Sequence, residues 1–170
     1  IKALLPTLRE SLPASVDVAA ARAAWARYPA AGAFLAHLAD AGTPRAVWSA
    51  PAGEDWPRLL AQAAAVTLSG GRGSVLCVPD RRDVARLDAA LTETLGEGHH
   101  VVLTAGAGPA RRYREFLAVA RGTRRIVVGT RAAAFAPVHE LGLVVIWDDG
   151  DDLHAEPRAP YPHAREVLLL

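Results

Sequence analysis

The sequence is poor in sulfur-containing and aromatic residues: its 170 residues include one cysteine, no methionine and only 6% aromatics. A single cysteine excludes an internal disulfide framework and argues against a cysteine-based zinc site. That residue, Cys77, lies inside the apolar run 74–78. We therefore expect a small buried hydrophobic side chain there rather than a reactive thiol.

Long apolar runs and a strong net charge are also absent. No run approaches the ~18 residues that a membrane span needs, so we expect no membrane association. The net charge is +1, so any surface that binds nucleic acid has to be local. The chain starts at Ile1 and stops at Leu170 inside an apolar run, which predicts that it is a piece of a longer protein.

Short apolar, β-rich runs alternate with helical patterns through most of the chain. Runs of this kind are typical of strands buried on both faces of a parallel sheet. The expected strands are 45–48, 74–78, 100–104, 125–128 and 143–147, and the expected helices are 57–69, 82–95 and 109–121. Asp80 is the expected N-cap of the second helix and Gly122 the expected stop of the third. The alternation predicts a three-layer α/β domain with a mainly parallel sheet.

Residues 1–44 precede this alternation. They carry an alanine-rich helical pattern at 19–31 and a second short helix that ends near Gly42. We expect 1–44 to form a connector with an N-terminal helical extension, and 45–170 to form the α/β domain.

Residues 46–56 read as a strand, a tight loop and a helix start, which is the setting of a phosphate-binding loop. Such a loop ends in G-K-[ST], but here Asp55 stands at the lysine position and Trp56 at the hydroxyl position. Two unit charges ~4 Å apart interact by about 4 kcal/mol at an effective dielectric of ~20, so reversing the sign repels a phosphate strongly. The degenerate phosphate loop comprises Ala52, Gly53, Glu54, Asp55 and Trp56.

Ligands of such sheets bind beyond the carboxyl ends of the strands, so the loops that follow the strands should carry the chemistry. Residues 127–137 read V-V-G-T-R-A-A-A-F-A-P, residues 141–146 read L-G-L-V-V-I, and residues 161–167 read Y-P-H-A-R-E-V. This order resembles the first motor domain of superfamily 2 helicases, and within them the PriA-like replication-restart proteins. Their pattern runs V-V-G-T-R-S-A-x-F-A-P, then L-G-L-I-I-V-D-E-E-H-D, then R-Y-H-A-R-D-V. The resemblance covers 45–170 and implies a RecA-like, P-loop NTPase-type fold.

The resemblance also implies a nucleotide site that has lost its chemistry. Where the family has D-E-E-H, with an aspartate for magnesium and a glutamate for the attacking water, this chain has Trp147, Asp148, Asp149 and Gly150. Phosphoryl transfer depends on charge neutralisation by lysine and metal, and both are missing here. We expect a domain that does not hydrolyse ATP and needs no cofactor. The alternative is an active ATP-dependent 3'-5' DNA helicase with an unorthodox site for ATP and magnesium.

In related helicases the loops after these strands face the nucleic acid. Carried over, the DNA-facing positions are Pro79, Asp80, Thr104, Gly129, Thr130 and Arg131. The family implies a cytoplasmic, nucleoid-associated role in which DNA forks and D-loops are recognised and the replisome is reloaded. Its expected partners are DNA, the single-stranded-DNA-binding protein and other primosome or replisome components. The arginine-rich segment 111–131 is either a solvated face or a patch that touches DNA phosphates.

Other side chains invite metal hypotheses. The carboxylates Asp148, Asp149, Asp151 and Asp152 suit Mg²⁺ in an unrelated α/β enzyme, or they form a solvated loop without an ion. Residues 99 and 100 are both histidines, but neighbours in a strand point to opposite faces and should not share a metal. For His154 and His163 we expect a surface role, and we assign no residue to a metal site.

Overall fold

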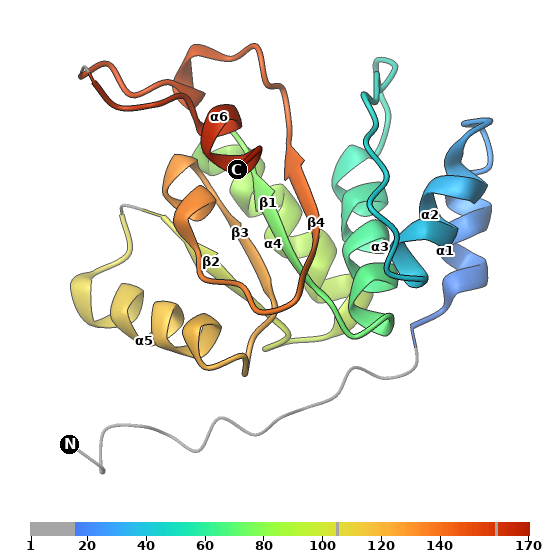
Figure 1. Cartoon of the computed structure of the whole chain (residues 1–170), viewed down its shortest axis with the longest axis horizontal. Helices are drawn as coiled ribbons and strands as arrows, with labels where there is room; N and C mark the ends of the chain where they lie inside the picture. The colour runs from blue at the N-terminus through green and yellow to red at the C-terminus, as the bar shows by residue number, and fades with distance from the viewer. Residues whose placement is uncertain (1–15, 105, 159) are drawn as a thin grey trace.

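The computed structural model describes residues 16–104, 106–158 and 160–170, so residues 1–15 of the expected connector segment 1–44 lie outside the described residues. Its centre is a four-stranded, all-parallel sheet with the strand order β2-β3-β1-β4 (Figure 1). The strands are β1 (Gly73–Cys77), β2 (His100–Leu103), β3 (Ile126–Gly129) and β4 (Leu141–Ile146). The helices are α1 (Val18–Ala24), α2 (Ala31–Ala39), α3 (Trp56–Ser69), α4 (Arg81–Leu95), α5 (Pro109–Ala120) and α6 (Ala164–Leu168), with short 3-10 turns η2 (Arg131–Phe135) and η3 (Asp152–His154).

Helices flank the sheet on both sides, which confirms the predicted α/β class. On one face, Leu76 of β1 and Val128 of β3 join the larger core with α3 and α4. On the other face, Val127 of β3 packs with Val119 of α5 and Ala133 of η2. Because both faces of β1 and β3 are covered, these strands read as continuous apolar runs without alternation.

The signals expected at the start of α4 and at the end of α5 are present, and α3 has a cap that was not predicted from the sequence. The Asp55 carboxylate accepts a hydrogen bond from the Arg58 amide at the start of α3, and the Asp80 carboxylate accepts one from the Asp83 amide at the start of α4. Gly122 follows α5 with a φ of +70°, a backbone conformation that suits glycine at the end of a helix. These caps fix where the two loops leading into α3 and α4 stop.

The N-terminal helices α1 and α2 pack into the same core as α3. The Trp25 indole N–H donates to the Leu59 carbonyl over 3.1 Å, which ties the end of α1 to α3. From the opposite end of α3, the Arg72 guanidinium donates to the carbonyls of Leu38 and Gly42 and so holds the end of α2.

The strand expected at 45–48 is wrong. These residues form no regular secondary structure, and Figure 1 draws them as a coil between α2 and α3. Two prolines without an amide N–H, Pro44 and Pro51, flank the stretch. Val47 is fully exposed, while the ring of Trp48 turns inward against other aromatic rings. Side-chain packing, rather than a hydrogen-bonded ladder, therefore holds this segment.

Candidate functional site

Trp56 and Trp147, the two residues expected at the replaced positions of a nucleotide site, lie in direct contact. The rings of Trp56 and Trp147 stack with their centroids 4.4 Å apart and an interplanar angle of 13°. Trp56 is the first residue of α3, and Trp147 follows β4 directly. By the resemblance described above, the related helicases have the phosphate-loop hydroxyl at the position of Trp56 and the magnesium-binding carboxylate at the position of Trp147. An apolar stack occupies the point where the two residues meet.

All four tryptophans of the sequence belong to one aromatic cluster. The Trp48 ring lies between Trp25, at 4.9 Å, and Trp147, at 5.6 Å, measured between centroids. Tyr28 adds an edge-on contact to Trp48. Such tilted and edge-to-face arrangements are the favourable ones for aromatic rings. The cluster joins the N-terminal helices, the degenerate phosphate loop and the end of β4.

The remaining residues of the degenerate phosphate loop have structural partners. Gly53 adopts a φ of +81°, and the Glu54 carboxylate accepts a 2.5 Å hydrogen bond from the Tyr28 hydroxyl and pairs with Arg27. Burial, and then the hydrogen bond to Glu54, raises the pKa of Tyr28. Asp55 caps α3 by accepting a hydrogen bond from the Arg58 amide.

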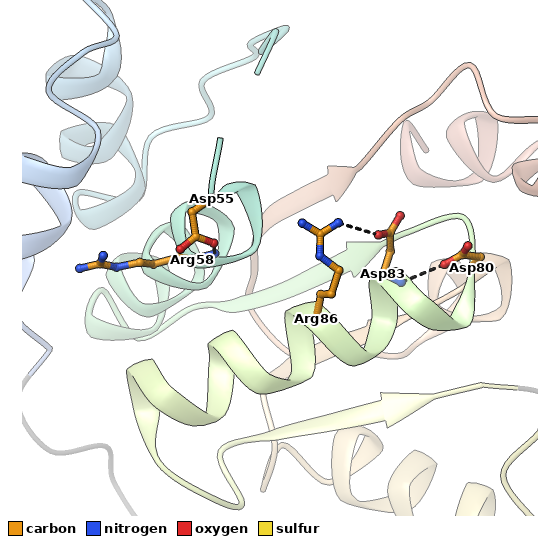
Figure 2. Close-up of polar contacts among 5 residues, drawn as sticks. All are labelled: Asp55, Arg58, Asp80, Asp83 and Arg86. Carbon is orange, nitrogen blue, oxygen red and sulfur yellow. Dashed lines mark hydrogen bonds and ion pairs between the residues drawn. The ribbon is translucent and has the colours of Figure 1, made fainter. Parts of the chain in front are cut away.

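The cation nearest the stack comes from α4. The Arg86 guanidinium lies over the Trp56 ring, 4.9 Å from its centroid. Figure 2 shows Arg86 turned back to its own helix, where it pairs with Asp83, while Asp55 and Arg58 lie at the start of α3. Arg86 is therefore engaged by the Trp56 ring and by the Asp83 carboxylate.

The acidic cluster after β4 does not converge. Asp148 has a φ of +51°, Asp149 pairs with Arg165 over 2.6 Å, and Asp151 accepts from the Leu153 amide at the start of η3. Within the described ranges, no three histidine, cysteine or acidic side chains come together in a geometry that could hold a metal ion.

The DNA-facing positions carried over from the helicases line an open groove beyond the strand ends. Its volume is about 760 Å³, and Pro79, Asp80, Thr130 and Arg131 all contribute to its walls. Exposed aromatic rings complete it, since Phe135 and Tyr161 are each about two-thirds exposed.

A second hollow of about 340 Å³ lies beside the groove and contains Thr104. Arg81 lines both spaces, so they share a wall. Gly129 lines neither: a Cβ there would lie 2.1 Å from the Leu103 carbonyl oxygen, which makes Gly129 a residue of strand packing. The structure thus brings five of the six carried-over positions to these two neighbouring spaces.

The Arg131 guanidinium forms hydrogen bonds with acceptors of the protein itself. It donates to the carbonyls of Leu153, at 3.1 Å, and Ala155, at 2.9 Å, and pairs with the Glu156 carboxylate at 2.8 Å. No sequence pattern predicts this arrangement, because the acceptors lie more than twenty residues away in an irregular segment.

The surface role expected for His154 is wrong, because its side chain is fully buried. Its Nε2 lies 2.9 Å from the Trp147 carbonyl, and its Nδ1 lies 3.9 Å from the Cys77 sulfur. Cys77 is buried as expected, and burial raises the pKa of its thiol to about 11. The His163 ring lies 6.0 Å from that of His154 and caps α6 through the Arg165 amide.

The two adjacent histidines have separate surroundings. His100 Nε2 contacts the Asp88 carboxylate at 2.6 Å, while burial, and then the Arg124 charge, lowers the pKa of His99. On α5, Arg111 pairs with Glu115, and Arg112 and Arg114 are exposed.

Comparison with known proteins shows which sequences this chain resembles. No family profile matches the chain. Over 146 residues, 86% of the chain, it is 53% identical to the probable replication restart protein PriA of Mycobacterium tuberculosis and 51% identical to that of Mycobacterium leprae. The replication restart protein PriA of Bacillus subtilis is 26% identical over 102 residues. The chain is PriA-like.

The match to PriA is partial. The chain spans 22% of the length of the mycobacterial PriA proteins. None of the helices in the described part of the chain has the length and apolar character that crossing a membrane requires. The PriA resemblance expected from the GTR segment and the strand-end motifs is confirmed, as is the α/β fold that it implies.

Proposed function

We propose that this PriA-like chain is a RecA-like helicase-type domain whose nucleotide site is inactive. The protein to which it belongs would act in replication restart by recognising DNA forks and D-loops and by reloading the replisome without hydrolysing ATP. The names of its relatives support the replication-restart role. The inactive site is our own inference from the residues at the strand ends.

The stack of Trp56 on Trp147 carries this proposal. Phosphoryl transfer needs cations that neutralise the charge developing on the transferred group. Two indole rings supply no such charge, and the adjacent Asp55 adds a negative one. Arg86 is held by the Trp56 ring and by Asp83. A magnesium nucleotide would have to displace the stack and tolerate the carboxylate.

The groove beyond the strand ends supports contact with DNA. It combines exposed rings with the cationic side chains Arg81 and Arg158. Aromatic rings and cations together are the usual elements of a surface for single-stranded nucleic acid. We propose that the domain contacts a DNA strand here, within assemblies that include the single-stranded-DNA-binding protein and other primosome components, in the cytoplasm at the nucleoid.

One observation favours the alternative of an active ATPase. Asp148 is a non-glycine residue at the end of β4 with a φ of +51°, and such strained positions cluster at functional sites. In an active enzyme Asp148 would orient the attacking water. The aspartate side chain also tolerates this conformation without any catalytic role, so the observation is weaker than the stack.

Steady-state ATP hydrolysis in the presence of fork DNA tests the proposal. We expect no turnover above background and no magnesium-dependent ATP binding in a calorimeter. Asp148→Asn is the informative variant, and Asp152→Asn is its matched control because it removes one exposed carboxylate of the same loop. Turnover that Asp148→Asn abolishes and Asp152→Asn retains would establish the active-helicase alternative. If the chain binds no DNA at low salt, the DNA contact proposed for it is wrong.

A further inference from the structure

Arg131 holds one wall of the groove through contacts that use the end of its guanidinium. Nη1 donates to the carbonyls of Leu153 and Ala155, and Nη2 donates to the Glu156 carboxylate. Leu153 and Glu156 themselves line the groove. The side chain is 37% exposed, and its partner Glu156 is 27% exposed, so the ion pair is partly shielded from water.

The buried side chain of His154 holds the same wall of the groove. The amide of Trp147 donates to the Cys77 carbonyl, as expected for the next step of the β1–β4 ladder. Within the described part of the chain, the carbonyl of Trp147 accepts no hydrogen bond from a neighbouring strand. Instead, His154 Nε2 donates to it over 2.9 Å. The buried imidazole thus satisfies the carbonyl that follows the last strand residue, and it ties the segment 153–156 to the end of β4.

These contacts leave Arg131 poorly placed to bind a phosphate. Bidentate recognition of an anion needs two parallel N–H bonds from the guanidinium fork. The fork end made by Nη1 and Nη2 already faces three protein acceptors, and one of them is a carboxylate that repels a phosphate. Arg81 and Arg158 also line the groove, both are exposed, and neither forms an ion pair with another described residue.

We propose that Arg131 is a positioning residue, which holds the wall 153–156 in place, and that Arg81 and Arg158 make the phosphate contacts of this groove. The assignment of phosphate contacts rests on the DNA binding proposed above. The positioning of the wall does not, because it concerns only contacts within the chain.

Amide hydrogen exchange on the DNA-free chain tests the positioning. We expect Arg131→Ala to accelerate exchange at 153–156 by about tenfold, since it removes three hydrogen bonds donated by a charged guanidinium, one of them to a carboxylate. Arg131→Lys should accelerate exchange in the same segment, because an ammonium cannot reproduce the planar fork. Arg22→Ala is the control, because Arg22 is an exposed arginine of α1. Unchanged exchange at 153–156 in Arg131→Ala would overturn the proposal.

The salt dependence of binding to a single-stranded oligonucleotide separates the two roles. Each phosphate contact contributes a slope of about −0.7 to the plot of log affinity against log salt concentration for single strands. We expect Arg81→Ala and Arg158→Ala each to make the negative slope shallower by about this amount. Arg131→Ala should weaken binding severalfold and leave the slope unchanged.

If Arg131→Ala makes the negative slope shallower by about 0.7, the proposal is overturned whatever the exchange shows, because Arg131 would then be a phosphate ligand. Slopes unchanged in both Arg81→Ala and Arg158→Ala would also overturn it. If the wild-type chain binds no oligonucleotide, the proposed DNA contact fails, and with it the assignment of Arg81 and Arg158. The exchange experiment then still decides the role of Arg131 as a positioning residue.

Discussion

Trp56 and Trp147 stack face to face, although one begins α3 and the other follows the edge strand β4. The contact joins the start of α3 to the end of β4, the two segments that we propose once formed a nucleotide site. Trp56 is almost fully buried and Trp147 is half-buried. The buried contact between the two rings therefore stabilises the folded state, whereas an open ligand site at the same place would leave these side chains unpacked.

A double-mutant cycle measures this stack. We expect Trp56→Ala to lower the free energy of unfolding by about 3–5 kcal/mol, as for other buried large aromatics. Combined with Trp147→Ala, the loss should fall short of the sum by about 0.5–1.5 kcal/mol, because the stacking is removed only once. Urea denaturation followed by circular dichroism provides the values. Pairing Trp56→Ala with Tyr161→Ala is the control and should be additive, since Tyr161 is exposed in the groove. Additive losses for the tryptophan pair would show that the stack is incidental.

Gly129 tests the packing between β3 and β2. A Cβ at this position would lie 2.1 Å from the Leu103 carbonyl oxygen and 3.0 Å from the Ala133 Cβ, and a backbone carbonyl cannot rotate away. We expect Gly129→Ala to destabilise the chain by about 3 kcal/mol, at the upper end for overpacking. Gly150→Ala should change stability by no more than about 0.5 kcal/mol, because nothing lies within 4 Å of a Cβ there. Thermal unfolding of the two variants compares them, and equal midpoints would contradict the close approach.

Cys77 provides a pH-dependent prediction. Its pKa of about 11 lies above the ordinary value of a thiol, so the folded chain keeps the proton to a higher pH than the unfolded chain. Where the folded state binds more protons, stability falls as pH rises. We expect the thiol to destabilise the fold progressively from about pH 9 to pH 11, and Cys77→Ser should remove this part of the pH profile.

The same thiol should react slowly with an alkylating reagent at pH 8 in the native chain and at the ordinary rate in urea, because the thiolate is the nucleophile. Rapid alkylation of the native chain would contradict the burial of Cys77.

Tyr28 reports on the link between the N-terminal helices and the degenerate phosphate loop. Its pKa is raised by burial first and then by the hydrogen bond to Glu54. We expect Glu54→Gln to lower the pKa of Tyr28 part of the way, because the contribution of burial remains. NMR titration of ring-labelled tyrosine gives the measurement, and Glu140→Gln, a change of a carboxylate far along the chain, serves as the control. A Tyr28 pKa that is unchanged in Glu54→Gln would show that the hydrogen bond is not formed in solution.

The sequence predicted those elements whose burial follows from local pattern. The apolar runs at β1 and β3 are covered on both faces, and Asp80 and Gly122 bound their helices as expected. Residues 45–48 have the same β-rich composition but form no strand, because the direction in which the Trp48 ring packs depends on partners far away in the chain.

The candidate site followed the same division. The resemblance predicts that positions 56 and 147 are lost nucleotide ligands, yet the sequence contains no signal that the two rings touch. Arg131 was identified from an intact motif as a DNA-facing residue. Its carbonyl acceptors belong to an irregular segment whose path no local pattern specifies, so its contacts emerged only from the structure.

The gathering of all four tryptophans into one cluster has an optical consequence. Light absorbed by any of the indoles enters a set of rings linked by centroid distances of 4.4–5.6 Å. The intrinsic fluorescence of the chain therefore reports on this cluster and on the helices that carry its rings, and it contains no indole signal from the groove. A fluorophore attached near Tyr161, which lines the groove, would give a second, separate emission, so the tryptophan cluster and the groove could be observed independently in one cuvette.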